Sequence, residues 1–216
     1  MLLVREIYPA IMGESRASGW PCAIVRLTGC HRRCSYCDTA YAFQGGERLD
    51  RKEILHRVAE IGLRTVLVTG GEPLLQEEVC ELMADLQAVG HTVVIETSGT
   101  TGATALDRVP AGVMRVVDVK APGSGLAESA IDWAGIAGLG ADDELKIVCC
   151  DRRDYLWARD VVRSGRLPAG VPVTFSPAWG EVDARRLAEW VLADRLDVRV
   201  QVQLHRLLWP EAEGGV

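Results

Sequence analysis

The sequence predicts an α/β fold, a partial and open (β/α) barrel of parallel strands with about six units. Short β-branched runs alternate with longer segments of helical period, which is typical of repeated strand–helix units. The chain has 216 residues, whereas a complete eight-unit barrel needs about 250. No linker or internal repeat divides the chain, so we expect one domain over residues 1–216.

The expected strands are short runs rich in Val, Ile and Thr. In chain order they cover residues 23–27, 65–69, 92–97, 114–120, 144–149, 171–175 and 198–204. An opening run, residues 2–8, is expected as an additional edge strand. Because parallel strands end at one rim of a sheet, the glycine-rich and polar sequences that follow them should meet there as a ligand site.

Amphipathic segments between these strands predict helices over residues 51–61, 75–89, 129–137, 153–163 and 182–193. In the last of them, Leu187, Trp190 and Val191 fall on one face. The tryptophans at 20, 133, 157, 190 and 209 are expected in the core or in a dimer interface. No role is predicted for the tail, residues 210–216.

Charge and composition favour a small-molecule partner. The chain carries 24 basic and 30 acidic residues, a net charge of −6, which argues against nucleic acid or an anionic membrane as partner. We see neither an export signal nor an apolar run long enough to span a bilayer. A cytoplasmic, reducing compartment is therefore expected, where cysteines more often bind metals than form disulfides.

Three of the seven cysteines, Cys30, Cys34 and Cys37, form a C-x3-C-x2-C loop directly after the strand at residues 23–27. Three thiolates can hold an iron–sulfur cluster and leave one iron open to a ligand. Two alternatives are a zinc site with His31 as the fourth ligand and cysteines that pack as small apolar side chains. The other four, Cys22, Cys80, Cys149 and Cys150, lack ligand spacing and are expected to pack.

A second motif, Thr69-Gly70-Gly71-Glu72-Pro73, ends the next strand. Together with the cysteine spacing it resembles the radical S-adenosylmethionine (SAM) superfamily. Several further stretches resemble the 7-carboxy-7-deazaguanine synthase family: Gly13-Glu14, Arg26, Cys37-Asp38-Thr39, Tyr41-Ala42-Phe43-x-Gly45-Gly46, Glu96-Thr97-Ser98-Gly99-Thr100 and Gln203-Leu204-His205. This resemblance covers nearly the whole chain.

The resemblance implies a small homodimeric lyase of queuosine precursor biosynthesis. Such an enzyme converts 6-carboxy-5,6,7,8-tetrahydropterin to 7-carboxy-7-deazaguanine with loss of ammonia. It requires a 4Fe-4S cluster, SAM and Mg²⁺. Its electron comes from a reductant protein such as flavodoxin or ferredoxin.

The same resemblance implies roles for individual residues. Cys30, Cys34 and Cys37 would bind the cluster, and Thr39 would bind magnesium. The cofactor SAM would contact Tyr36, Cys37, Asp38, Gly71, Glu72, Gly99 and the turn Ser176, Pro177, Ala178 and Trp179. The substrate would contact Ile11, Met12, Gly13, Arg26, Thr97 and His205. Two positions depart from the family pattern, because glutamine is common at Met12 and another residue is usual at Ser176.

Charged side chains on inner strands are costly unless they are paired or used. We therefore expect at least one of Glu144, Lys146 and Lys120 to contact SAM or the region of Glu72. The structural alternatives are an internal Glu–Lys pair and an Asp118–Lys120 pair. Similarly, Arg26 could be salt-bridged, Thr39 could bond to the loop backbone, and His205, expected on the strand 198–204, could be a core histidine.

Two other functions remain open from the residues alone. One is an activase that installs a glycyl radical on a partner enzyme, with the same cluster and SAM chemistry. The other is a zinc-stabilised binding module without catalysis. Arg26, the Cys37-Asp38-Thr39 stretch and the end at His205 favour the pterin enzyme.

Overall fold

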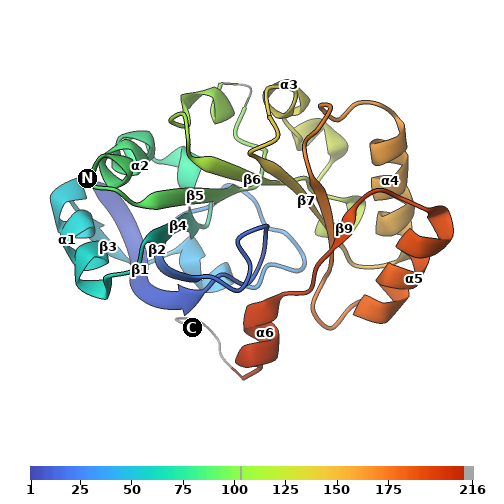
Figure 1. The fold of residues 1–216 in the computed structure, drawn as a ribbon, viewed down its shortest axis with the longest axis horizontal. Helices are drawn as coiled ribbons and strands as arrows, with labels where there is room; N and C mark the ends of the chain where they lie inside the picture. Colours follow the sequence, from blue (N-terminus) through green and yellow to red (C-terminus); the bar gives the residue numbers. More distant parts are fainter. Residues whose placement is uncertain (103, 212–216) are drawn as a thin grey trace.

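A nine-stranded, mostly parallel sheet runs through the computed structural model, which describes residues 1–102 and 104–211 (Figure 1). Its strand order is β3-β1-β2-β4-β5-β6-β7-β8-β9. The strands are β1 (Leu2–Ile11), β2 (Pro21–Leu27), β3 (Glu47–Leu49), β4 (Thr65–Gly70), β5 (Thr92–Thr97), β6 (Met114–Asp118), β7 (Glu144–Cys149), β8 (Val173–Pro177) and β9 (Arg199–Val200). Because β3 and β9 leave two free edges, the barrel is open, as the sequence predicted.

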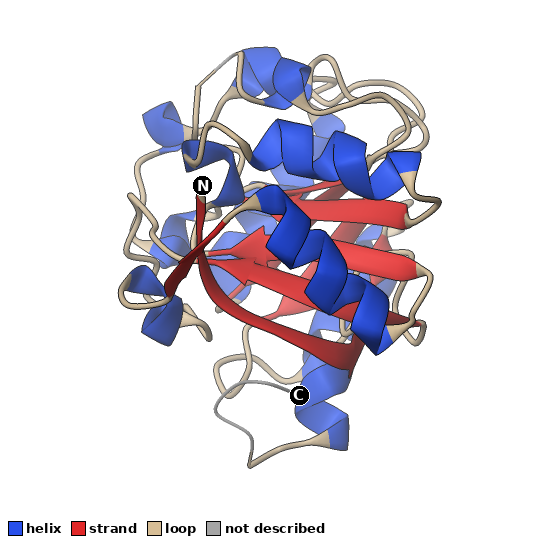
Figure 2. Cartoon of the chain, turned by 90° about the vertical axis from the view of Figure 1, so that its left-hand side faces the viewer, coloured by secondary structure: helices blue, strands red, loops and turns tan. Residues whose placement is uncertain are grey.

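Helices cover the outer face of this sheet (Figure 2). They are α1 (Arg51–Ile61), α2 (Val79–Ala88), α3 (Trp133–Ile136), α4 (Arg152–Arg163) and α5 (Ala184–Asp194). The last helix, α6 (Leu204–Leu208), lies apart from them and lines the cavity described below. A typical helix is α1. The side chain of its N-cap, Asp50, accepts a hydrogen bond from the Glu53 amide, and its C-cap, Gly62, has a left-handed backbone conformation. It buries Ile54 and Val58 against the sheet in the main hydrophobic core.

The first strand is longer and less peripheral than expected. The strand β1 continues to Ile11 and pairs with β2 on one side and with β3 on the other, both antiparallel. The true edge is the three-residue β3, which was not predicted. The predicted edge position of β1 was therefore wrong, because a short distant segment pairs with its outer side.

The C-terminal prediction was also wrong. Only Arg199–Val200 joins the sheet, and the expected strand over 198–204 gives way to α6. The amide of Leu204 donates to the carbonyl of Gly13 at 2.9 Å, which anchors the start of α6 to the loop after β1. A long-range contact therefore overrides the alternation of Val198, Val200 and Val202.

Two expected helices are shorter than predicted. The segment 129–137 forms a 3₁₀ turn, Glu128–Ala130, followed by the four-residue α3, whose N-cap is Asp132. Likewise, Pro73–Leu75 is a 3₁₀ turn, and α2 begins only at Val79. The parallel strands β2 and β4 to β8 match their expected positions closely.

Trp190 packs beside Tyr155, with ring centroids 5.3 Å apart. By contrast, Trp20 is 67% exposed and Trp209 is 37% exposed, so neither lies in the core of this chain. All seven cysteines are free, with Cys22 and Cys149 buried. Residues 212–216 of the tail lie outside the described part of the chain.

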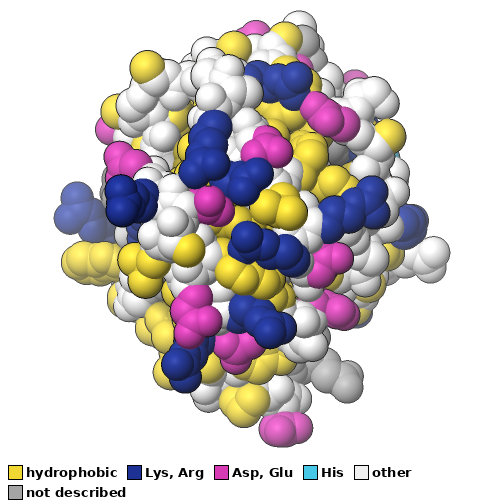
Figure 3. Space-filling model, turned by 90° about the vertical axis from the view of Figure 1, so that its right-hand side faces the viewer, with side chains coloured by type: hydrophobic (Ala, Val, Ile, Leu, Met, Phe, Trp, Pro, Cys, Tyr) yellow, Lys and Arg dark blue, Asp and Glu magenta, His cyan; other side chains and the backbone are white. Residues whose placement is uncertain are grey.

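The face over α4 and α5 mixes basic, acidic and apolar side chains (Figure 3). Ion pairs on it include Arg163–Asp194 and Arg185–Glu189. Among the described residues, no helix combines the length and the apolar character that crossing a bilayer would require.

Candidate active site

A cavity of about 410 Å³ opens where the parallel strands end. It gathers most of the residues that the sequence singled out. The predicted site residues that line it are Ile11, Gly13, Arg26, Cys30, Cys34, Tyr36, Cys37, Asp38, Thr39, Gly71, Thr97, Lys146, Ala178, Trp179 and His205. The structure therefore brings most of the predicted site residues to one cavity, together with several partners that the sequence did not indicate.

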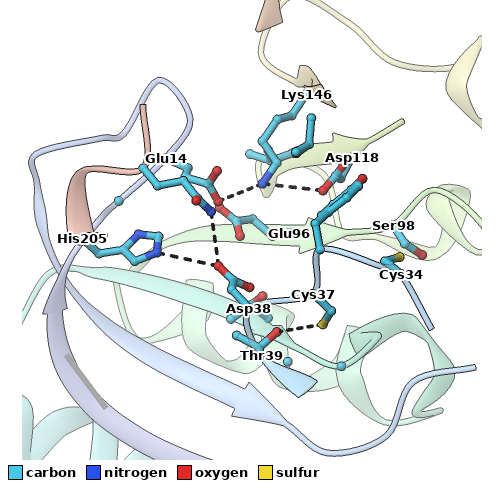
Figure 4. Close-up of a pocket in the computed structure, with 18 of the residues that line it drawn as sticks. Glu14, Cys34, Cys37, Asp38, Thr39, Glu96, Ser98, Asp118, Lys146 and His205 are labelled. Carbon is cyan, nitrogen blue, oxygen red and sulfur yellow. Dashed lines mark hydrogen bonds and ion pairs between the residues drawn. The ribbon is translucent and has the colours of Figure 1, made fainter. Parts of the chain in front are cut away.

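The three cysteines of the C-x3-C-x2-C loop face this cavity as free, partly buried thiols. Burial raises the pKa of both Cys30 and Cys34. Cys37 Sγ lies 3.8 Å from Thr39 Oγ1, so the hydroxyl faces the same space (Figure 4). Three free thiols that line one cavity fit a cluster that leaves one iron for a ligand. Within the described residues, no three His, Cys, Asp or Glu side chains form a site for a single metal ion.

The glycines after β4 allow close packing on the cysteine loop. A Cβ added at Gly71 would overlap the Gly29 carbonyl oxygen and lie 3.0 Å from Cys30 Cβ. The Gly71 amide donates to the Leu27 carbonyl at 3.0 Å, and the Glu72 amide donates to the Gly29 carbonyl at 2.8 Å. These two hydrogen bonds join the two loops. These glycines thus serve backbone packing around the cysteines as well as the edge of the cavity.

Glu72 braces two loops. Its carboxylate is 1% exposed and accepts bonds from the Leu74 amide, the Thr97 hydroxyl and both the amide and hydroxyl of Ser98, at 2.6–3.1 Å. It does not line the cavity. The structure therefore gives Glu72 a positioning role for Thr97 and Ser98.

Arg26, on β2, also lines the cavity and lies inside a polar cage. Its Nε donates to Glu6 at 2.8 Å and its Nη2 donates to the Tyr8 hydroxyl at 2.9 Å. Tyr41 donates to the same Glu6 oxygen at 2.7 Å. Burial lowers the pKa of Arg26, but Tyr8, Tyr41 and Glu6 raise it more, so the guanidinium stays charged.

Arg26 is thus salt-bridged, as one alternative predicted, and it also faces the cavity. Neither Glu6 nor Tyr8 was predicted from the sequence as a partner of Arg26. Their contact with Arg26 depends on the antiparallel register of β1 and β2, in which Glu6 pairs with Arg26 and Tyr8 with Ile24.

Lys146 lies on β7 between two carboxylates (Figure 4). Its Nζ is 2.9 Å from Glu14 and 3.8 Å from Asp118. Lys120 also bonds to Asp118, at 2.8 Å, as one alternative predicted. Burial lowers the pKa of Lys146, but Glu14, Glu96 and Asp118 raise it well above its usual value. One oxygen each of Glu14 and Asp118 is buried without a partner within the described chain, which leaves acceptors for a ligand.

Glu144, considered with Lys146 as a SAM contact, lies outside the cavity lining. Its side chain is fully buried and contacts Thr174, Arg16 and Arg199 instead. An internal Glu144–Lys146 pair is therefore not formed. The strand alternation placed both residues inward, but it did not show that the loop after β1 brings Glu14 to the lysine.

Asp38 links the cysteine loop to the C-terminal helix. Its Oδ2 is 3.2 Å from Gln203 Nε2 and 3.8 Å from His205 Nε2. Burial raises the pKa of Asp38, but the His205 hydrogen bond and the charges of His205, Lys146 and Arg206 lower it to about 2. His205 thus reaches the cavity from α6 rather than from a strand.

The remaining predicted positions lie away from the cavity lining. Met12 is fully buried in a small second core with Ile24 and Leu67, Gly99 is buried, and Ser176 Oγ is buried without a partner within the described chain. Pro177 ends β8 just before the lining residues Ala178 and Trp179. No side-chain contact of Met12 with a ligand in the cavity is available in this arrangement.

Comparison with known proteins agrees with this geometry. Residues 24–119 match the model of the Radical SAM superfamily. The chain is 41% identical over 216 residues to "7-carboxy-7-deazaguanine synthase" of Chlorobaculum tepidum, covering 99% of this chain and 97% of the relative. It is 42% identical over 229 residues to the protein of that name from Koribacter versatilis, covering 98% and 99%.

Two solved structures share the fold. The crystal structure of QueE from Escherichia coli has a TM-score of 0.75 at 20% identity and covers 94% of this chain and 93% of that one. The structure of Streptococcus suis SuiB bound to S-adenosylmethionine has a TM-score of 0.57 at 12% identity, and covers 85% and 48%.

Proposed function

Since this chain belongs to the 7-carboxy-7-deazaguanine synthase family of radical SAM proteins, we propose that it converts 6-carboxy-5,6,7,8-tetrahydropterin to 7-carboxy-7-deazaguanine with loss of ammonia. The observation that carries the proposal is a cavity lined both by three free cysteines and by a caged arginine. The cysteines suit a cluster, and the arginine suits a carboxylate.

Cys30, Cys34 and Cys37 would hold a 4Fe-4S cluster. With SAM bound, that cluster supplies the one-electron chemistry that removes a hydrogen atom from the substrate. Four residues that line the same cavity, Tyr36, Asp38, Ala178 and Trp179, are the candidates to surround SAM. Glu72 supports this site indirectly, because it fixes Thr97 and Ser98.

Arg26 would bind the substrate carboxylate. Its Nε and Nη2 are held by Glu6 and Tyr8, which leaves Nη1 without a bond to any described residue. A guanidinium held at two nitrogens loses little freedom when the third binds a ligand, and it presents a fixed positive charge. Thr97 and His205 line the same cavity and would contact the ring.

Magnesium would bind at Thr39. The hydroxyl faces the cavity, and Mg²⁺ accepts a single protein oxygen when substrate and water complete its octahedron. The expected consequence is a lower turnover of Thr39→Ala with a changed response to added Mg²⁺. Thr92→Ala, at an exposed position on β5, is the matched control. An unchanged magnesium response of Thr39→Ala would contradict this assignment.

A reductant protein such as flavodoxin or ferredoxin would supply the electron, and the working form would be a homodimer. Exposed apolar side chains on and after α6, Leu207, Leu208 and Trp209, support an interface there. Light scattering of the purified protein measures the dimer directly. A monomer at micromolar concentration would contradict it.

The decisive experiment is incubation of the anaerobically reconstituted, reduced protein with SAM and 6-carboxytetrahydropterin, followed by mass spectrometry. We expect 7-carboxy-7-deazaguanine and ammonia from the wild type and neither from Cys34→Ala. A wild-type protein that carries its cluster but forms no deazaguanine would refute the proposal and favour the glycyl-radical activase.

A further inference from the structure

One inner carboxylate of the cavity has no partner within the described part of the chain. Glu96, on β5, lines the cavity, and no hydrogen bond or ion pair joins its side chain to any described residue. Figure 4 shows Glu96 next to Glu14 and Asp118, with its side chain in the cavity. Burial raises the pKa of Glu96, although the charges of Lys146 and Arg26 oppose this. Glu96 is half-buried, and a carboxylate partly removed from water without a donor is unfavourable unless a ligand provides one.

The other carboxylates of the cavity are already bound or exposed. Glu14 is bonded to Lys146, Asp118 to Lys120, and Asp38 to Gln203. Glu181 also lines the cavity, but it is exposed at its rim. Glu14 and Asp118 each keep one buried oxygen without a partner, whereas neither oxygen of Glu96 is bonded to a described residue. Glu96 is therefore the inner carboxylate with both oxygens left for a ligand.

Glu96 and Arg26 lie in one row of side chains that crosses three neighbouring strands. Arg26 pairs with Thr69 across β2 and β4, and Val68 pairs with Ile95 across β4 and β5. Thr69 and Glu96 are the next residues along, so Arg26, Thr69 and Glu96 form one row across three strands. Two strand spacings make the row about 10 Å wide. All three side chains line the cavity.

This row has a cation at one end and an unpartnered anion at the other. A pterin that bears a carboxylate on one ring carries its 2-amino group and N3–H on the other ring, and a deazaguanine carries the equivalent 2-amino group and N1–H. In each molecule both groups are hydrogen-bond donors that point outward side by side. A carboxylate can accept both bonds at once, in the bidentate manner that gives strong and specific recognition.

We propose that Glu96 is the specificity-determining residue that accepts the 2-amino and N3–H donors of the substrate's pyrimidinone ring, while Arg26 holds the carboxylate at the opposite end. The assignment rests on the proposed function. It explains why a carboxylate remains unpaired on an inner strand, and it fixes the orientation of the bicyclic ring between β2 and β5.

The test measures binding instead of turnover. The reconstituted enzyme with SAM is titrated with 7-carboxy-7-deazaguanine and with its analogue that lacks the 2-amino group. We expect the wild type to prefer the amino ligand about 10- to 100-fold, the range for bidentate recognition of a base edge. Glu96→Gln should reduce this preference at least about fivefold, because its amide nitrogen faces the donor N1–H of the deazaguanine.

Two further variants separate the role of Glu96 from general effects. Glu96→Asp keeps the carboxylate and should retain part of the amino preference. Glu181→Gln removes the same charge from the rim and should leave both affinities unchanged. Cluster absorbance and melting temperature verify that every variant is folded and loaded.

The outcomes distinguish this inference from the proposed function. If the wild type binds neither ligand, the proposed function fails. If the wild type binds both ligands but shows no amino preference, or Glu96→Gln keeps the full preference, the role of Glu96 is refuted. If Glu96→Gln weakens the binding of both ligands by the same factor, the role of Glu96 is also refuted.

Discussion

Gly13 lies directly against the imidazole of His205. A Cβ added at Gly13 would overlap Nδ1 and lie 2.9 Å from Cγ of that ring. The carbonyl of Gly13 also accepts the Leu204 amide at 2.9 Å. The missing side chain therefore lets α6 bring a histidine into the cavity, which explains a glycine that the sequence motif alone left without a physical reason.

Replacement of Gly13 should act through His205. Gly13→Ala displaces the ring and weakens its contact with Asp38, so we expect KM for the pterin to rise about tenfold with unchanged iron content. Steady-state kinetics measures KM, and iron analysis measures the iron content. In a His205→Ala background the same glycine change should add little. Additive effects of the two changes would show that Gly13 acts independently of the histidine.

Glu6 should control substrate affinity without touching the substrate. Its carboxylate holds Arg26 Nε and the Tyr41 hydroxyl. Glu6→Gln weakens a charge-assisted bond, so we expect KM to rise about five- to tenfold while kcat changes little. Glu47→Gln, an exposed carboxylate on the neighbouring strand β3, is the control. A fall in kcat at constant KM would contradict a positioning role.

The sequence predicted the open barrel and the rim loops because both depend on local signals. Alternating strand and helix patterns locate β2 and β4 to β8, and the cysteine and glycine motifs mark loops that follow strands. What it missed depends on contacts between distant residues. The Arg26–Glu6 bond needs the β1–β2 register, and the Lys146–Glu14 pair joins residues 132 positions apart.

The C-terminal error has the same cause. Valines at 198, 200 and 202 alternate as in a strand, yet α6 forms where Leu204 meets Gly13. The importance of Glu96 was likewise invisible. It was part of a motif, but only the three-dimensional structure shows that its neighbours Glu14 and Asp118 are neutralised while it is not.

Gly71 should be required for cluster assembly. Because a Cβ at this position would overlap the Gly29 carbonyl, Gly71→Ala must push the cysteine loop away from β4. We expect at least about a twofold loss of bound iron and a melting temperature lowered by several degrees, since overpacking costs about 1–3 kcal/mol. Gly140→Ala, whose Cβ would meet Asp143 at an ordinary 3.9 Å, should keep its iron. Full iron content in Gly71→Ala would overturn the prediction.

Asp143 should make stability depend on pH. Burial raises its pKa, but bonds from Arg115 and from the Gly140 amide lower it below the usual value. The charged form is thus favoured in the folded state, so its contribution is complete above the unfolded pKa of about 3.9 and is lost as the pH falls through the lower folded value.

Asp143→Asn should therefore lower the free energy of unfolding by about 1–3 kcal/mol at pH 7, and by less at pH 3. Urea titration of the cluster-free protein at both pH values measures the difference. Asp197→Asn, at an exposed position, is the control. A deficit of Asp143→Asn that is equal at the two pH values would show that charge is not the cause.

Loss of Lys146 should mainly reduce the stability of the fold and only secondarily affect cofactor binding. Its ammonium neutralises Glu14 and lies near Asp118, and the side chains of all three are at most 16% exposed. Removal of one partner from such a buried pair costs about 3–5 kcal/mol, because the remaining carboxylate stays desolvated. Lys146→Met should therefore lower the melting temperature strongly, whereas Lys52→Met, on the exposed side of α1, should not. The double variant Glu14→Gln with Lys146→Met should recover part of the loss, since it removes the orphaned charge as well. A Lys146→Met protein that melts like the wild type but binds SAM more weakly would instead assign the lysine to the cofactor.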